Sequence, residues 1–303
     1  MTSGPVARQV AGAATLRSAL LEAGRALRAA GVASPRPDAE ELAAHLIGVG
    51  RGQLWQHLDA PAPAGFPDLV QRRAHRVPLQ HITGRAYFRH LTLHVGPGVF
   101  IPRPETEVVV GHVIELLQTM AAAEPVEGRP QVAVDLGAGS GAIALSLAGE
   151  VPGLQVHAVE ADPGVMPWLR HNTADSTVQV HHDDLAVALV GVENQVDVVV
   201  SNPPYIPKDA VPRDPEVARF DPPQALYSGT DGLEHVRAVE RVAHRLLRHD
   251  GFVVVEHADQ QGRSAPGVFA GAPGWSDVSD HIDLAGRPRY LVARRDRRSE
   301  RAG

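Results

Sequence analysis

Hydrophobic residues in the first part of the chain recur at the spacing expected of α-helices. Thr15 and Asp38 each stand before such a series, which predicts that they cap the first two helices. A further helix is expected over Pro67–Arg76, with its arginines on a solvated face. Residues 1–84 are therefore predicted to form a small all-helical domain. The arginines concerned are Arg72, Arg73 and Arg76.

A change of pattern follows this helical part. Apolar and polar residues alternate on both sides of Arg89–His90, which predicts a β-hairpin. The dense glycines and prolines of Gly96–Pro104 predict a structured loop, so residues 85–104 are interpreted as a hairpin and linker. A helix is expected from Glu105 to Met120, at the start of a third region that spans residues 105–303.

From Gln131 onward, buried-type strands alternate with helices. This alternation predicts parallel pairing and an α/β fold with a doubly wound, mostly parallel sheet. A tail rich in arginine, Arg294–Arg301, is expected to be a solvated terminus. The predicted strands are Val132–Leu136, Gln155–Glu160, Val178–His182, Val196–Ser201 and Phe252–Glu256, with edge strands at Trp275–Ile282 and Arg289–Val292, and the predicted helices are Ala142–Gly149, Val165–Thr173 and Leu233–Arg248.

Composition narrows the possible functions. The 303 residues carry a net charge of −6, so the surface as a whole lacks the positive field of a nucleic-acid coat. There is no cysteine, which excludes disulfides, thiolate metal sites and a cysteine nucleophile, and which suits the reducing cytoplasm. The first apolar stretch, Val10–Leu16, is too short for a signal peptide. No histidine pattern suggests a metal site, and none is expected.

A glycine loop follows the first strand of the α/β region. Glycine permits tight turns and close approach of a ligand, and exposed N–H groups at the next helix favour polar or anionic groups. Gly137, Gly139 and Ala142 satisfy the dinucleotide pattern, so a nicotinamide enzyme must be considered. Asp135 inside the strand end and Gly141 as the fifth loop residue favour S-adenosylmethionine instead. The loop alone indicates a nucleotide-like cofactor and leaves its identity open.

Carboxylates stand at the ends of the next two strands. Glu160 closes the second strand, where a carboxylate can accept hydrogen bonds from both hydroxyls of a ribose. Asp183 and Asp184 close the third strand, and either one could meet the amino group of an adenine.

The fourth strand ends in Asn202, Pro203, Pro204 and Tyr205. In doubly wound sheets, ligands bind beyond the carboxyl ends of the strands, so this tetrapeptide should face the glycine loop. The side-chain carbonyl of Asn202 and the backbone carbonyl of Pro203 can each accept one hydrogen of a planar NH₂ group, while Tyr205 stacks on that group. Such positioning favours attack of the nitrogen on a methyl group and requires no metal or strong base.

Several motifs together make the chain resemble the HemK/PrmC family, the release-factor glutamine N(5)-methyltransferases. The block at Phe100–Glu107, placed before the cofactor loop, makes the resemblance specific, because Asn-Pro-Pro-Tyr alone also occurs in adenine-N6 methyltransferases. The motifs, spread over about residues 78–292, are Pro78–Gly84, Phe100–Glu107, Asp135–Ala144, Ser201–Ile206 and Phe252–His257.

The resemblance implies a class I S-adenosylmethionine-dependent methyltransferase with a seven-stranded sheet and a small N-terminal helical domain for substrate recognition. Its implied substrate is the glutamine of the Gly-Gly-Gln motif in class 1 peptide chain release factors. Asn202 is implied to contact both cofactor and substrate, and Pro203, Pro204 and Tyr205 to form the substrate pocket. The implied cofactor contacts are Gly137, Ala138, Gly139, Ser140, Gly141, Glu160, Asp184, Leu185 and Asn202.

This sequence departs from the family pattern at two positions. Glu160 replaces a more usual aspartate, and Leu185 stands where some members carry an aromatic residue against adenine.

One alternative is methylation of an exocyclic amino group of adenine or guanine in DNA or RNA, which requires a flipped or unpaired base and a basic path to it. The acidic charge counts against that alternative. A catalytically silent binding module should lack Asn202 or the glycines, and this chain keeps both. We expect a cytoplasmic monomer with no stable nucleic-acid or membrane partner.

Overall fold

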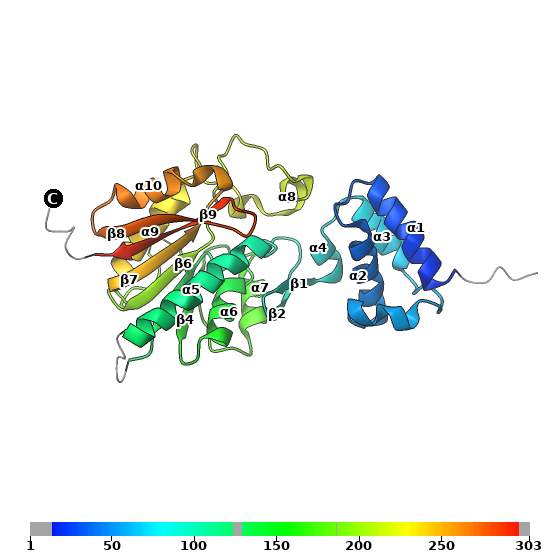
Figure 1. Ribbon diagram of the computed structural model, residues 1–303, viewed down its shortest axis with the longest axis horizontal. Coiled ribbons are helices and arrows are strands. Elements are labelled where there is room, and N and C mark those ends of the chain that lie inside the picture. Colours follow the sequence, from blue (N-terminus) through cyan, green and yellow to red (C-terminus); the bar gives the residue numbers. More distant parts are fainter. Residues whose placement is uncertain (1–13, 124–128, 186, 297–303) are drawn as a thin grey trace, which may run out of the picture. The chain divides into compact units, whose positions relative to one another are not determined.

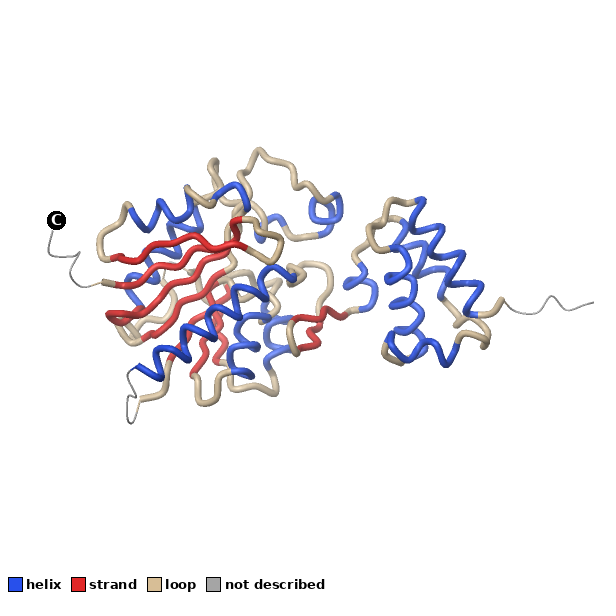
Figure 2. Tube along the Cα trace, in the orientation of Figure 1, coloured by secondary structure: helices blue, strands red, loops and turns tan. Residues whose placement is uncertain are grey.

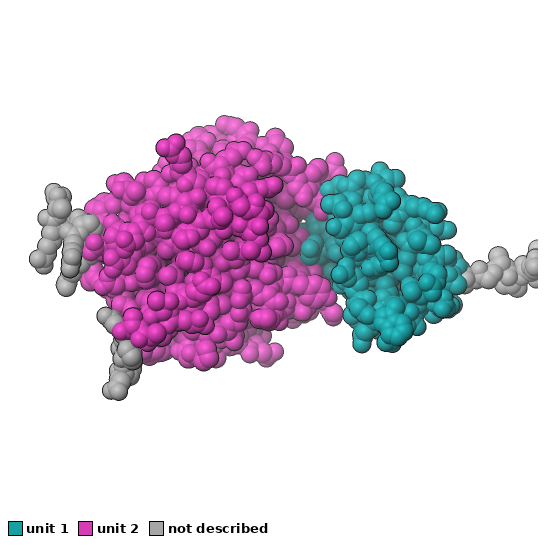
Figure 3. Space-filling view, in the orientation of Figure 1, with its two compact units in different colours: residues 1–83 teal, residues 84–303 magenta. Residues whose placement is uncertain are grey.

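The computed structural model describes residues 14–123, 129–185 and 187–296. The chain separates into two compact units, residues 1–83 and residues 84–303, which Figure 3 shows in different colours. Most of the apolar stretch Val10–Leu16 and three of the C-terminal arginines (Arg297, Arg298 and Arg301) lie outside the described residues.

The first unit is helical. Its core contains Leu16, Leu27, Leu42 and Phe66, all nearly or fully buried. Thr15 caps the first helix, because its hydroxyl oxygen accepts a hydrogen bond from the Ser18 N–H, as the sequence predicted. The elements are α1 (Leu16–Ala29), α2 (Pro35–Ile47), η1 (Arg51–His57), α3 (Phe66–Ala74) and α4 (Leu79–Thr83).

Two sequence predictions in this unit are wrong. Helix α2 begins at Pro35 after Ser34, so Asp38 lies within its first turn and does not cap it. The carboxylate of Asp38 instead accepts a hydrogen bond from Arg73 Nε at 2.7 Å, and both side chains are buried. Arg73 is therefore not on a solvated face. A buried charge needs a partner of opposite sign, and periodicity alone does not reveal which surface arginine supplies it.

The second unit contains a seven-stranded, mostly parallel sheet in the order β5-β4-β3-β6-β7-β9-β8 (Figures 1 and 2). Strand β3 lies next to β6. Of the two predicted edge strands, β8 lies at the edge of the sheet, whereas β9 lies between β7 and β8 and pairs antiparallel with both. The predicted hairpin is also present. The strands are β1 (Arg85–Phe88), β2 (Leu91–His94), β3 (Val132–Leu136), β4 (Gln155–Glu160), β5 (Gln179–His182), β6 (Val196–Ser201), β7 (Leu247–Glu256), β8 (Trp275–Ile282) and β9 (Pro288–Arg295).

Helices cover both faces of this sheet. One hydrophobic core joins the sheet to α5 (Pro104–Ala123), α6 (Ala142–Glu150) and α7 (Met166–Thr173), and it includes the hairpin. The other joins it to α9 (Glu234–Leu246) and α10 (Ser264–Ala270). Helix α10 was not predicted, because it contains both a proline and a glycine. The remaining short helices are α8 (Pro215–Phe220), η2 (Pro223–Ala225) and η3 (Asp259–Gln261).

The prediction of a solvated C-terminal tail fails at its first two residues. Strand β9 runs on to Arg295, which is buried. Arg294 forms ion pairs with Asp277 and Asp250 at 2.7 Å each. These acidic partners lie on or beside neighbouring strands, so they hold the arginine within the sheet edge.

Among the described residues, no helix combines the length and the apolar character needed to cross a membrane.

Candidate active site

A cavity of about 230 Å³ opens at the carboxyl ends of β3, β4 and β6 in the second unit. Its walls bring together the glycine loop, the end of β4 and the tetrapeptide that follows β6. The corner at Asn202 is therefore open to a ligand and is not filled by the protein's own side chains. The lining residues from these segments are Gly137, Ala138, Gly139, Ser140, Glu160, Asn202, Pro204 and Tyr205.

The glycine loop forms one wall through its backbone. Gly137 and Gly139 have φ angles of 78° and 58°, a conformation that favours glycine. A Cβ atom added to either residue would meet nothing within 4 Å, so both backbones face open space. The N–H groups of Gly137 and Ala138 donate to the Val159 carbonyl at 2.9 Å, which ties the loop to β4. This open cradle fits a polar ligand that approaches the backbone closely.

Gly141 packs closely against a neighbouring helix. Its φ of 87° places it at the start of α6, and it does not line the cavity. A Cβ atom here would lie 3.0 Å from Leu169 Cδ1 and 3.5 Å from Thr173 Cγ2, both on α7. The glycine is required by close packing between α6 and α7.

Glu160 is held by backbone donors on both sides. Its Oε2 accepts a hydrogen bond from the Gly139 N–H and its Oε1 accepts one from the Asp162 N–H, each at 2.9 Å. A carboxylate has about four acceptor sites, so two remain for hydroxyl groups of a ligand. Because both carboxylate oxygens are held by hydrogen bonds, the glutamate side chain is fixed although it is longer than the aspartate more usual in the family.

The adenine contacts expected after β5 are not brought to the cavity. Asp184 is exposed, and Leu185 packs against the hydrophobic core on the side of α9 and α10. Asp183 accepts a hydrogen bond from the Asp184 N–H at 2.9 Å. None of the three lines the cavity.

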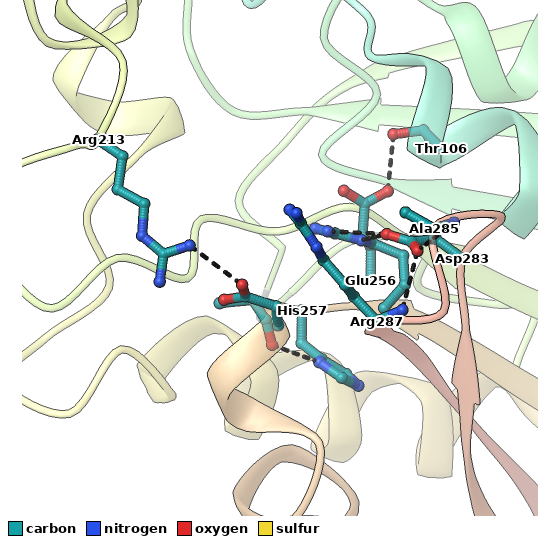
Figure 4. Close-up of polar contacts among 10 residues, drawn as sticks. Thr106, Arg213, Glu256, His257, Asp283, Ala285 and Arg287 are labelled. Carbon is teal, nitrogen blue, oxygen red and sulfur yellow. Dashed lines mark hydrogen bonds and ion pairs between the residues drawn. The ribbon is translucent and has the colours of Figure 1, made fainter.

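Asn202 is oriented by a buried chain of hydrogen bonds from other elements. Its Nδ2 donates to Thr106 Oγ1 at 3.2 Å. That hydroxyl donates to Glu256 Oε2 at 2.7 Å, the bond drawn between these two residues in Figure 4. Thr106 lies in the first turn of α5, Glu256 ends β7, and both are buried. Since Nδ2 is directed at Thr106, the carbonyl is the end of the Asn202 amide that does not bond to this hydroxyl, and Asn202 itself lines the cavity.

The rest of the tetrapeptide is fixed by its backbone. Ile206 forms a β-bridge with Tyr227, and the Tyr205 carbonyl accepts a hydrogen bond from Gln261 Nε2 at 3.2 Å. Pro204 and Tyr205 line the cavity, whereas Pro203 is buried behind them. Burial raises the pKa of the Tyr205 phenol, so the ring remains neutral.

Two buried carboxyl groups stand near the cavity walls. Burial raises the pKa of Glu256 to about 7, and Thr106 and Arg289 oppose the shift. Burial also raises the pKa of Asp135 to about 7. Asp135 Oδ2 accepts a hydrogen bond from the Ala144 N–H at 3.1 Å, which orients the first turn of α6. Its Oδ1 has no partner among the described residues.

Part of the cavity wall comes from residues that the sequence did not single out. Phe100, Arg103 and Thr106 from the block before α5 line it, although the sequence gave them no individual role. Arg103 forms a 2.6 Å ion pair with the nearly inaccessible Asp221 carboxylate. This pair ties the block to the outer wall, which includes Val217, Pro222, Gln224, Ala225 and Leu226. The density of glycine and proline before α5 was the available signal.

The sheet order, the glycine loop and the Asn-Pro-Pro-Tyr corner define a class I methyltransferase. Residues 18–84 match the model of the PrmC N-terminal domain and residues 91–215 that of the methyltransferase small domain. The release factor glutamine methyltransferase of Streptomyces coelicolor is 52% identical over 92% of this chain and 98% of its own length. The chain belongs to the release factor glutamine methyltransferase family.

Two further comparisons place this family in context. A 4-amino-L-phenylalanine/4-methylamino-L-phenylalanine methyltransferase of Streptomyces pristinaespiralis is 37% identical over 89% of this chain and 92% of its own length. Among solved structures, the hMettl16 catalytic domain in complex with a 3′UTR hairpin has a TM-score of 0.52 at 16% identity, and covers 76% of this chain and 82% of that chain. The second likeness concerns the fold alone.

Proposed function

We propose that this protein transfers a methyl group from S-adenosylmethionine to the side-chain amide nitrogen of the Gly-Gly-Gln glutamine in a class 1 peptide chain release factor. The observation that carries the proposal is the orientation of Asn202, which donates its Nδ2 to Thr106 and lines the same cavity as the glycine loop. The 52% identity to a release factor glutamine methyltransferase over nearly the whole chain supports the same substrate.

The residues present fit the cofactor. The open backbones of Gly137 and Gly139 would receive its polar groups, with Ala138 and Ser140 beside them, and the fixed Glu160 carboxylate would accept the ribose hydroxyls. S-adenosylmethionine supplies a methyl group on a sulfonium that is already a good leaving group. We assign no cofactor contact to Asp184, Leu185 or Gly141, which do not line the cavity.

The protein's own part in the reaction is to position an unreactive amide. A carboxamide nitrogen is a weak nucleophile because its lone pair is delocalised. The Asn202 carbonyl and the Pro203 backbone carbonyl would accept its two hydrogens, which holds the lone pair toward the methyl group. Tyr205, which is neutral and lines the cavity, would stack on the planar group. Orientation of this kind is worth up to ~7–11 kcal/mol in well-aligned systems.

The organisation of the chain follows from this assignment. The helical N-terminal domain, residues 1–84, is proposed to recognise the release factor. Residues 85–104 form the hairpin and linker, and residues 105–303 the catalytic domain. A monomer without a stable nucleic-acid partner would suffice, since every wall of the cavity comes from one unit. The absence of cysteine supports a cytoplasmic location.

The test offers the purified protein three acceptors with isotopically labelled S-adenosylmethionine. These are an unmethylated class 1 release factor, a mixture of tRNA, rRNA and DNA, and 4-amino-L-phenylalanine. We expect label on the release factor alone, and mass spectrometry should place it on the Gly-Gly-Gln glutamine. A release factor whose glutamine is replaced by glutamate is the control and should remain unlabelled. Label on nucleic acid or on the free amino acid would overturn the proposal.

A further inference from the structure

We propose that Thr106 and Glu256 are positioning residues for methyl transfer, because together they determine which end of the Asn202 amide, the carbonyl or the NH₂ group, is directed into the cavity. The inference rests on the proposed function in one respect: the methyl acceptor must be a planar NH₂ group. The three side chains come from α5, the end of β7 and the loop after β6, so no single element could supply the arrangement.

The hydrogen-bond count fixes the direction of the chain. A threonine hydroxyl has one hydrogen. Thr106 gives that hydrogen to the Glu256 carboxylate at 2.7 Å and can then only accept from Asn202. Of the two ends of the Asn202 amide, only Nδ2 can donate, and it does so at 3.2 Å. The carbonyl is therefore directed elsewhere, and Asn202 lines the cavity.

Burial gives this chain its strength. Thr106 and Glu256 are 3% and 1% exposed, so water does not compete for their hydrogen bonds. A hydrogen bond that ends on a carboxylate is stronger than a neutral one, and successive bonds polarise each other. Donation from Nδ2 therefore increases the negative charge on the Asn202 carbonyl and makes it a better acceptor for the substrate N–H.

Burying a carboxyl group that has a single hydrogen-bond partner is unfavourable for the free energy of folding. Among the described residues, Thr106 is the one group that donates to Glu256. The charged groups that act on Glu256 are Arg289 of β9, Arg103 before α5 and Glu105 in α5, and the Tyr205 phenol also lies within its field. A simple structural role would be served as well by an apolar side chain at this position. The orientation of Asn202 gives a reason for an acid at this position.

Protonation of Glu256 would reverse the direction of the hydrogen bonds that link Glu256, Thr106 and Asn202. A neutral Glu256 can donate to Thr106, whose hydrogen is then free to turn toward Asn202 and attract its carbonyl. Since burial raises the pKa of Glu256 to about 7, the ionised form that supports transfer is lost as pH falls through this value. Asp135 titrates in the same range, so the acidic limb must be assigned by comparison with a Glu256 variant.

The experiment uses the full-length chain, a purified unmethylated class 1 release factor and labelled S-adenosylmethionine. Thr106→Val removes the hydroxyl at constant size, and we expect kcat to fall roughly tenfold, the effect of one net hydrogen bond. KM for the release factor and Kd for S-adenosylmethionine should stay within about twofold. Thr106→Ser should restore most of kcat. Thr119→Val, an exposed threonine on the same helix, is the matched control.

Glu256→Gln provides the second, independent measurement. It keeps the size of the side chain but no longer titrates, and its amide can donate to Thr106 as well as accept. We expect kcat to fall several-fold at alkaline pH and the acidic limb of the pH profile to shrink.

Three outcomes would overturn the inference: unchanged kcat in Thr106→Val, no recovery in Thr106→Ser, or an unaltered acidic limb in Glu256→Gln. A wild-type protein that labels no release factor would instead refute the proposed function, so the two failures are distinguishable.

Discussion

The two walls of the cavity are built in different ways. The wall at β3 and β4 consists of backbone: open glycines and N–H groups tied to the Val159 carbonyl and the Glu160 carboxylate. The wall at β6 relies on a side chain, Asn202, whose amide bonds to Thr106, 96 residues earlier in the sequence, and Thr106 in turn bonds to Glu256, 150 residues after it. Backbone geometry suits recognition of a constant cofactor. A polarised side chain suits the group where charge develops during the reaction.

The largest effect should come from removal of the acceptor on the β6 wall. Asn202→Ala is expected to slow methyl transfer by ~3 kcal/mol, about a hundredfold, because one preorganised polar contact is lost. The affinity for S-adenosylmethionine, measured by calorimetry, should change little, since the glycine wall is intact. Gln118→Ala, an exposed amide on α5, serves as the control. A wild-type rate in Asn202→Ala would refute the mechanism.

The opposite behaviour is expected on the β4 wall. Glu160→Ala should weaken S-adenosylmethionine binding by about 2 kcal/mol, roughly thirtyfold, because hydrogen bonds to a charged acceptor are lost. At saturating cofactor, kcat should remain close to that of the wild type. Titration calorimetry and steady-state kinetics check both parts, with the exposed Glu115→Ala as control. Unaltered cofactor affinity would show that this carboxylate does not hold the ribose.

A substitution at Gly141 tests whether the end of the glycine loop is needed for the packing of α6 against α7. Gly141→Ala should lower the free energy of unfolding by about 1–2 kcal/mol, since an alanine is strained at positive φ and its Cβ would press on Leu169. Gly149→Ala is the matched control on the same helix, because a Cβ there meets nothing within 4 Å and φ is not positive. This second change should be neutral or stabilising. Denaturant titration measures both, and equal effects would contradict the packing argument.

The smallest effect concerns proton binding by Glu256, which is linked to Asn202 through Thr106. The pKa of Glu256 is raised on folding, so its contribution to stability is present at low pH and is lost as pH rises through about 7. Between about pH 6 and about pH 8, the free energy of unfolding of the wild type should fall by on the order of 1 kcal/mol more than that of Glu256→Gln. Thermal unfolding of both proteins across this range provides the measurement. Parallel curves would mean that Glu256 does not change its protonation there.

The residues of the two walls differ in how well they could be predicted from the sequence. The glycine wall is contiguous with its strand, so strand, loop and carboxylate could be predicted from local spacing alone. Asn202 was found because it follows a buried strand directly. Thr106 and Glu256 could not be assigned, because a hydrogen-bond chain across three elements leaves no periodic signal.

Tertiary packing also decides the roles of Asp38 in the helical unit and Gly141 in the second unit. Asp38 has the residue type and position of a cap, yet tertiary pairing with Arg73 determines where it lies. The sequence presents Gly141 as part of the glycine loop, and the structure shows that it packs against a neighbouring helix. Residue type indicated that each position was constrained, and only the packed fold shows what constrains it.

The parallel pairing of β3 and β6 has a consequence for distance. Leu136 and Ser201 are partners in the register, and the Ser201 hydroxyl donates to the Leu136 carbonyl at 2.6 Å, directly before the chain leaves each strand. The two loops thus start one interstrand repeat apart, about 4.8 Å. A pleated sheet cannot stretch this repeat, so the spacing between the start of the cofactor loop and the start of the Asn202 loop is fixed. Slippage by a single residue would aim the Asn202 side chain at the opposite face and abolish the alignment.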